Sequence, residues 1–241
     1  MLSIAQRTAR MFASARWTPA RASGGSLWLR ADLGVTLATG VSSWADQLGV
    51  QSPFVQATGS GQPTMSTSAV NGHPAVVTNG SQHLLLSSFS PPSTDAEIWI
   101  VCKAPTSSGA ITDVGGDPNM SIYPFAADGK IYERAATTIR KSFAPVVDVT
   151  QWHVYSIRSS AGSWTAYQSG VQAFATASNT VGWGASGGAF GLLGRADGTF
   201  MAAGDGIAEV WMGRIMSGAD RAKARAYIAA RYGFTLGGDW I

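Results

Sequence analysis

The last forty residues constrain the fold of this chain most strongly. An apolar segment, residues 207–212, predicts a β-strand, and the segment that follows it predicts a helix. Ser217 is a suitable N-cap because Asp220 follows three residues later, and Gly233 supplies a C-terminal stop. Small side chains recur along one face of this helix: Ala222, Ala226 and Ala229. The chain therefore resembles a β-domain that ends in one helix.

Strand-like segments recur through the rest of the chain at a spacing of about 8–12 residues, which is typical of sandwiches and barrels. Turn dipeptides such as Asn79-Gly80 and Asp128-Gly129 separate them. The strongest segment, residues 96–103, is apolar almost throughout and predicts a central strand covered on both faces. Cys102, the only cysteine, lies inside it, so a buried thiol and no intrachain disulfide are expected. No apolar run is long enough to span a membrane.

Short motifs occur in a characteristic order between residues 27 and 236. They include Leu27-Trp28-Leu29 with Asp32, Ser43-Trp44-Ala45-Asp46, Gln62-Pro63-Thr64, Asn71-Gly72-His73-Pro74, Trp152-His153-Val154-Tyr155, Ile207-Ala208-Glu209-Val210-Trp211 and Ala226-Tyr227-Ile228-Ala229. In this order they resemble the laminin-G-like, concanavalin A-like jelly-roll domains, most nearly those of tailed-bacteriophage virion proteins and some bacterial surface proteins. The resemblance implies an all-β, two-sheet antiparallel jelly-roll sandwich. It implies no single function, because this fold hosts lectins, glycosidases and structural modules.

Charge divides the chain into two expected parts. Residues 1–30 contain five arginines and no acid, whereas residues 31–241 contain 12 basic and 14 acidic side chains. We expect a basic arm and linker over residues 1–26. Over residues 27–241 we expect the jelly-roll domain, with its helix packed on one sheet edge. The near-neutral domain lacks the basic face of a nucleic-acid-binding protein.

The arm is expected to anchor the protein on a partner or a neighbouring subunit. Its basic side chains would make the contacts: Arg7, Arg10, Arg16 and Arg21. Two alternatives stay open. The arm could fold against its own domain, or residues 1–17 could be an Arg-rich targeting segment.

Catalytic chemistry is not indicated by the acidic residues. Glycoside hydrolysis needs two carboxylates across the cleaved bond, and related glucanases place three acids along one strand. Neither Glu97 nor Glu209 is followed by such acids, so both are expected at strand ends or facing solvent. A Gly-x-Ser-x-Gly match at residues 184–188 has no helix after it and is interpreted as a loop. We therefore expect a protein that is not an enzyme.

Metal binding has one weak candidate. A Gly-rich loop holds Asp113, Asp117 and Asn119, which could bind calcium through loop oxygens, although an ordinary turn is favoured. The three histidines (His73, His83 and His153) have no metal-ligand spacing and are expected to be structural. No cofactor is expected.

The tryptophans suggest a sugar-binding alternative. Four lie in apolar strands and are predicted to be core residues: Trp28, Trp99, Trp152 and Trp211. Four others are expected to be freer, and exposed indole faces among them could stack on sugars: Trp44, Trp164, Trp183 and Trp240.

The sequence favours a non-enzymatic structural protein located in a bacteriophage virion. A capsid decoration protein, a head fibre or a tail appendage would fit, with the arm bound to capsid or tail proteins. A homo-oligomer, such as a trimer, is expected because of the way in which this fold is usually used in virus particles. The alternative is a lectin-like, carbohydrate-binding module that attaches to a surface glycan. Neither nucleic acid nor a membrane is an expected partner.

Overall fold

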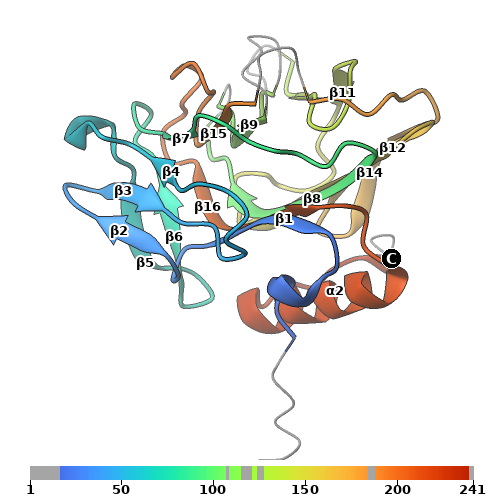
Figure 1. The fold of residues 1–241 in the computed structure, drawn as a ribbon, viewed down its shortest axis with the longest axis horizontal. Coiled ribbons are helices and arrows are strands. Elements are labelled where there is room, and N and C mark those ends of the chain that lie inside the picture. Colours follow the sequence, from blue (N-terminus) through green and yellow to red (C-terminus); the bar gives the residue numbers. More distant parts are fainter. Residues whose placement is uncertain (1–16, 107–108, 115–120, 124–127, 184–187, 239–241) are drawn as a thin grey trace, which may run out of the picture.

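A computed structural model describes residues 17–106, 109–114, 121–123, 128–183 and 188–238. Two antiparallel sheets face each other, and helix α2 (Gly218–Tyr232) lies outside the larger one (Figure 1). This architecture confirms the predicted all-β, two-sheet antiparallel sandwich with a C-terminal helix.

The larger sheet, called here the large sheet, has the strand order β14-β13-β12-β8-β16-β6-β5, and β1 also pairs with β16. Its strands are β1 (Gly25–Arg30), β5 (Thr64–Val70), β6 (His73–Val77), β8 (Asp95–Lys103), β12 (His153–Ser160), β13 (Ser163–Gln168), β14 (Val171–Thr176) and β16 (Gly206–Gly213). Strands β8 and β16 are central, as the apolar run at residues 96–103 predicted.

The smaller sheet has the order β2-β3-β4-β7-β15-β9. Its strands are β2 (Val35–Leu37), β3 (Val41–Trp44), β4 (Phe54–Val55), β7 (Leu84–Leu86), β9 (Thr112–Val114) and β15 (Phe190–Leu192). A separate hairpin joins β10 (Ile131–Glu133) to β11 (Lys141–Phe143). Short 3-10 helices occur at η1 (Pro19–Arg21) and η2 (Gly59–Gly61).

The main apolar core lies between the two sheets and includes two tryptophans that were expected to be freer. Trp44 and Trp164 are both 0% exposed, so that expectation was wrong. Each indole N–H donates to a backbone carbonyl, Trp44 to Arg30 at 3.2 Å and Trp164 to Ala135 at 3.1 Å. Because the one polar atom of each ring is satisfied, the whole side chain can be buried.

The remaining tryptophans divide between interior and half-buried positions. Trp28, Trp99 and Trp211 are buried as predicted, in a second apolar layer between the large sheet and α2. Trp152, predicted to be core, is half-buried, with the Lys103 ammonium 5.5 Å from its ring. Trp183 is half-buried and donates to the Pro92 carbonyl at 2.7 Å, whereas Trp240 lies outside the described residues.

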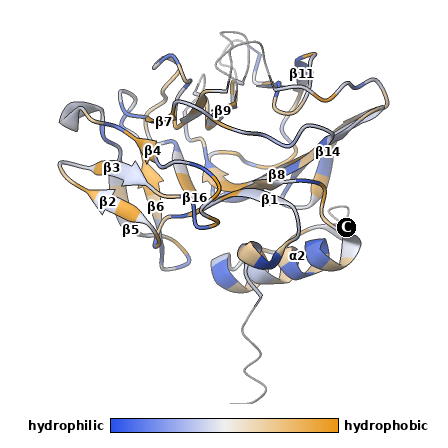
Figure 2. Cartoon of the chain, viewed as in Figure 1, coloured by the Kyte–Doolittle hydropathy of each residue, from blue (hydrophilic) through white to orange (hydrophobic). Residues whose placement is uncertain are grey.

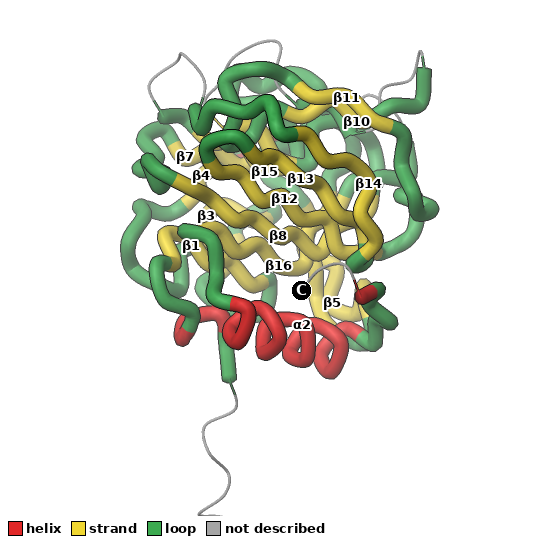
Figure 3. Tube along the Cα trace, turned by 90° about the vertical axis from the view of Figure 1, so that its right-hand side faces the viewer, coloured by secondary structure: helices red, strands yellow, loops and turns green. Residues whose placement is uncertain are grey.

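Helix α2 packs on the outer face of the large sheet, which corrects the expected position on a sheet edge (Figure 3). Its predicted ends are confirmed: Ser217 Oγ accepts the Asp220 N–H at 3.1 Å, and Gly233 adopts a left-handed φ of 74°. Hydrophilic and hydrophobic residues alternate along the helix (Figure 2). The face that packs consists of Arg221, Ala224, Tyr227, Ile228 and Tyr232, so the alanine face seen in the sequence is not the packing face.

The segment before β1 lies against this helix. The Trp17 ring meets the Tyr227 ring edge-on at 6.0 Å, and Ala22 is buried in the layer beneath α2. The boundary predicted between residues 26 and 27 falls inside β1, which begins at Gly25. Within the described residues, no helix is long and apolar enough to cross a membrane.

Candidate functional site

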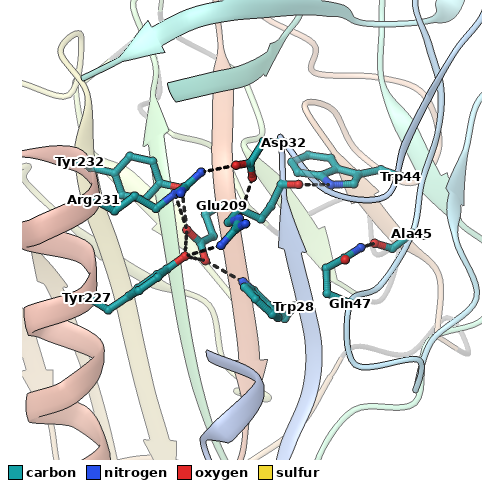
Figure 4. Close-up of polar contacts among 10 residues, drawn as sticks. Trp28, Asp32, Trp44, Ala45, Gln47, Glu209, Tyr227, Arg231 and Tyr232 are labelled. Atoms are coloured by element: carbon teal, nitrogen blue, oxygen red, sulfur yellow. Dashed lines mark hydrogen bonds and ion pairs between the residues drawn. The ribbon is translucent and has the colours of Figure 1, made fainter. Parts of the chain in front are cut away.

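A buried carboxylate on β16 is the centre of a polar cluster beneath α2 (Figure 4). Glu209 is 0% exposed. Its oxygens accept hydrogen bonds from Trp28 Nε1 at 2.6 Å, from the Tyr227 hydroxyl at 2.9 Å and from the Tyr232 hydroxyl at 2.6 Å. The Arg231 Nε lies 3.9 Å away. The expectation that Glu209 faces solvent was therefore wrong.

Strand register and helix periodicity together build this cluster. Glu209 pairs with Arg30 across the β1–β16 ladder, which brings β1 side chains beside it. On α2, Tyr227 and Arg231 are four residues apart and therefore share one face. The carboxylate tolerates burial because several donors replace the water it loses.

Asp32 connects the cluster to the surface. Its carboxylate is ion-paired with Arg30 Nε at 2.6 Å and with Arg231 Nη2 at 2.7 Å. Arg30 Nη1 also donates to the Tyr227 hydroxyl at 3.3 Å. Both arginine side chains are only about 15% exposed, and their ion pairs with Asp32 orient them at the boundary between interior and solvent.

Burial raises the pKa of Glu209 to about 7, although the hydrogen bonds from Tyr232, Trp28 and Tyr227 oppose the shift. Burial and the nearby Glu209 carboxylate also raise the pKa of Tyr232 and of Tyr227, so both phenols stay protonated and donate. The cluster can therefore gain or lose one proton near neutral pH, at Glu209.

A surface hollow of about 220 Å³, called here the Trp17 hollow, opens directly above this cluster. It is lined by Trp17, Thr18, Arg30, His73, Tyr227, Ala230 and Arg231. A second hollow of about 210 Å³ shares Trp17, Tyr227 and Ala230 with it and is lined by Lys223 and Ala226 as well. Trp17 thus borders both hollows.

The lining of the Trp17 hollow suits a polyhydroxylated ligand. Trp17 presents a large apolar ring beside two guanidinium groups. Among the described residues, the hydrogen bonds of these groups use Nε and Nη1 of Arg30 and Nη2 of Arg231. Nη2 of Arg30 and Nη1 of Arg231 can donate to hydroxyl or carboxylate oxygens, and the His73 ring also lines the hollow. Burial and the Arg231 charge lower the pKa of His73, so its ring is neutral at pH 7.

A second buried carboxylate, Glu97, anchors the opposite end of the helix. Glu97 is 0% exposed, which contradicts its expected exposure, and it binds Arg221 bidentately, Nε to Oε1 and Nη2 to Oε2, both at 3.0 Å. The Met216 N–H donates to the same carboxylate at 3.0 Å. Because Arg221 belongs to α2 and Met216 lies just before it, this contact holds the helix on the sheet.

The third glutamate is also enclosed. Glu133 is 3% exposed and accepts hydrogen bonds from the backbone N–H groups of Arg134 and Ala135 at 2.9 Å and from the Tyr155 hydroxyl at 3.2 Å. Burial raises its pKa. Each glutamate is thus enclosed by its own set of protein donors, not set opposite a second acid in a groove.

Other candidates from the sequence are placed as follows. Arg21 is exposed at the end of η1, whereas Arg7, Arg10 and Arg16 lie outside the described residues. Asp113 is buried in β9 and accepts the Ala196 N–H at 3.1 Å; Asp117 and Asn119 of the same loop lie outside the described residues. The described part of the chain contains no group of three His, Cys, Asp or Glu residues able to hold a metal.

The Cys102 and His153 side chains lie in contact in the buried interior. Cys102 is 0% exposed, as predicted, and burial raises the pKa of its thiol. Its Sγ lies 3.8 Å from His153 Nε2, which is also 2.7 Å from the Tyr123 hydroxyl. Burial lowers the pKa of His153, so the imidazole is neutral and packs as part of the core.

Sequence reasoning missed the residues that build the Trp17 hollow. Trp17 had been counted with the arm, and no pattern placed Tyr227 or Arg231 opposite Glu209. Two signals were present. Two tyrosines, Tyr227 and Tyr232, lie five residues apart in the helix, and a glutamate stands in the middle of an apolar strand. Together they indicate a helix face that covers a buried acid.

Several solved structures share this fold. Domain 4 of AbnA, a GH43 extracellular arabinanase from Geobacillus stearothermophilus solved in complex with arabinotriose, superposes with a TM-score of 0.60 at 14% identity, covering 86% of this chain and 100% of that domain. Trypanosoma rangeli sialidase superposes with a TM-score of 0.54 at 9% identity. The match covers 88% of this chain and 33% of the sialidase.

A toxin domain has the same fold. The binding domain of Paraclostridial Mosquitocidal Protein 1 superposes with a TM-score of 0.59 at 7% identity, covering 88% of this chain and 53% of that one. At these identities the likenesses show the fold alone. No protein-family model and no curated protein sequence matches the chain.

Proposed function

We propose that this chain is a non-catalytic, glycan-binding β-sandwich domain that holds a saccharide in the Trp17 hollow. The observation that carries the proposal is the lining of that hollow, where an indole ring lies beside two oriented guanidinium groups and a phenol. Rings of this kind stack on the apolar faces of sugars, and fixed planar donors bind their oxygens. The likeness to a domain solved with arabinotriose supports the same class of ligand.

The surroundings of the three glutamates support a binding role without catalysis. The three glutamates are buried and hydrogen-bonded to protein groups. Hydrolysis of a glycosidic bond needs two accessible carboxylates on opposite sides of it. The Trp17 hollow is lined instead by cations, hydroxyl groups and rings.

A place in a bacteriophage virion is a narrower form of this proposal. It rests on the sequence resemblance and on the acid-free segment before Trp17, which carries Arg7, Arg10 and Arg16. The domain would then display its hollow outward as an adhesin, and the arm would bind capsid or tail proteins. Density-gradient banding of particles, with this chain probed by mass spectrometry, tests that role: presence in the particle band supports it, and recovery only in the soluble fraction overturns it.

Glycan binding by the full-length chain tests the main proposal. An array that includes arabinotriose would be probed with the natural protein and with Trp17→Ala. We expect the natural protein to bind at least one glycan and Trp17→Ala to lose roughly tenfold or more in affinity, about 1.4 kcal/mol. Phe200→Ala is the matched control, because Phe200 is an exposed aromatic residue, 38% accessible, beside Arg195 and away from this hollow. Equal binding by Trp17→Ala, or no binding by the natural protein, would overturn the proposal.

A further inference from the structure

A second polar surface lies on the outer face of the large sheet, near the beginning of α2. Two adjoining hollows share Ile215 as a common wall, and we call them together the Ile215 groove. One hollow, of about 250 Å³, is lined by Arg158, Ser160, Ser163, Thr165 and Tyr167. The other, of about 230 Å³, is lined by Ser23, Gly24, Asp95 and Arg214. None of these residues lines the Trp17 hollow.

Strand register places the first set on one face. Arg158 pairs with Thr165 and Ser160 pairs with Ser163 across the β12–β13 ladder. Directly paired residues project to the same side of a sheet, so these four side chains form a compact patch. The patch therefore results from regular β-structure, which fixes its geometry more firmly than a loop would.

The hydroxyl groups of this patch are unused by the fold. Among the described residues, the side chains of Ser160, Ser163 and Thr165 make no hydrogen bond. Each hydroxyl can donate one hydrogen bond and accept two. Three unengaged hydroxyls around one hollow of a rigid sheet can therefore bind the oxygens of a ligand.

A guanidinium group is held in the same hollow. The Arg158 guanidinium carbon lies 4.3 Å from the centre of the Tyr167 ring, a stacking distance that fixes the plane of the group. Arg158 is the one cationic side chain among the described residues that line this hollow, and the charges of Arg221 and Glu97 also act on it. On the other side, Arg214 is paired with Asp95 at 3.0 Å, yet its side chain is 62% exposed.

We propose that the Ile215 groove binds an acidic polysaccharide, with Arg158 and the hydroxyls of Ser160, Ser163 and Thr165 holding an oxyanion substituent of one sugar and Arg214 and Asp95 contacting the next. Oxyanions, whether carboxylate or sulfate, accept hydrogen bonds from both hydroxyl and guanidinium donors. This inference rests on the proposed glycan-binding function and adds a second contact with a stated charge. Two separated contacts on one chain would also strengthen attachment through multivalency.

Three polymers test the charge requirement with the full-length protein: neutral dextran, dextran sulfate and polygalacturonate. We expect binding to dextran sulfate or polygalacturonate, or both, to exceed binding to dextran, and to weaken as salt is added. The two acidic polymers separate sulfate from carboxylate recognition. Equal binding of neutral dextran and both acidic polymers would overturn the inference.

Substitutions locate the contact. Ser163→Ala/Thr165→Val removes two hydroxyls and is expected to weaken acidic-polymer binding roughly tenfold. Arg158→Lys keeps the charge but loses the stacked planar fork, and a similar loss is expected. Ser142→Ala/Thr36→Val, at exposed positions on other strands, is the matched control, and Lys130→Gln controls for charge.

The outcomes of the two proposals are distinguishable. If Trp17→Ala abolishes glycan binding while Ser163→Ala/Thr165→Val binds as well as the natural protein, the Ile215 groove is overturned and the Trp17 hollow stands. If the groove variant loses acidic-polymer binding and Trp17→Ala loses nothing, the groove stands and the Trp17 hollow is overturned. Circular dichroism of each variant confirms that a loss of binding does not result from unfolding.

Discussion

Two buried carboxylates face the same helix from the same sheet, and their surroundings differ. Glu97 on β8 is enclosed by a bidentate arginine and a backbone N–H. Glu209 on β16 is surrounded by two phenols and an indole, with its nearest guanidinium nitrogen 3.9 Å away. A fully paired charge makes a fixed attachment, whereas a charge held mainly by neutral donors keeps a raised pKa and lies beneath an open hollow.

This difference indicates a division of roles along α2. The end near Arg221 attaches the helix to the sheet, and the end near Tyr227 and Arg231 contributes to a surface that can receive a ligand. Buried ion pairs are themselves weak evidence of added stability, but removal of one partner is costly because it leaves the other charge unpaired. The comparison can therefore be tested by removing partners at each end separately.

The largest effect is expected at the Glu97 end. Arg221→Leu leaves Glu97 buried without its partner and should lower the free energy of unfolding by about 3–5 kcal/mol, measured by urea denaturation. The double variant Glu97→Leu/Arg221→Leu removes both charges and should recover most of that loss. A cost below about 1 kcal/mol for Arg221→Leu would show that this end does not hold the helix.

A pH-dependent effect is expected at the Glu209 end. The pKa of Glu209 is about 7 in the folded protein against 4.5 as its ordinary value, so the folded state binds more protons between these values. The stabilising contribution of Glu209 should therefore be fully present below pH 4.5 and be lost as the pH rises to about 7, a loss of about 3 kcal/mol at 1.36 kcal/mol per pKa unit.

Glu209→Gln isolates this contribution. Asp205, whose pKa burial raises to about 8, contributes a loss of the same sign and remains in both proteins. The difference between the natural protein and Glu209→Gln, followed by urea denaturation from pH 4 to pH 8, should therefore change across the window from 4.5 to 7. A constant difference across that range would contradict a raised pKa at Glu209.

The smallest effect is expected from one phenol. Tyr232→Phe removes a 2.6 Å hydrogen bond to Glu209 while two other donors remain, and should cost about 1–2 kcal/mol. Because that hydrogen bond opposes the shift, its loss should also raise the pH midpoint of the stability change. Tyr132→Phe loses a solvent-exposed hydrogen bond to Asp128 and should leave stability nearly unchanged. An unchanged pH midpoint in Tyr232→Phe would contradict the assigned role.

The fold was more predictable from the sequence than the site. Strand spacing and turn dipeptides depend on local chemistry, and the helix ends at Ser217 and Gly233 follow from the same kind of signal. The burial of Glu97 and Glu209 does not follow from local signals, because both carboxylates are hydrogen-bonded by side chains of α2. The helix partner of Glu97 is 124 residues further along the chain, and those of Glu209 are 18 and 23 residues further. Trp44 and Trp164 were misplaced for the same reason, since distant carbonyl groups allow their rings into the core.

The position of β16 has a consequence for how the chain reaches its native state. This strand pairs with β8, β6 and β1, yet it ends at Gly213, near the C-terminal end of the sequence. During synthesis β1 therefore remains unpaired until β16, about 180 residues further along the chain, has been made, and the large sheet lacks its middle until then. Such non-local pairing favours slow folding. A nascent chain that stops before residue 206 would expose β1 and β8 as open edges, a form suited to capture by chaperones or to aggregation.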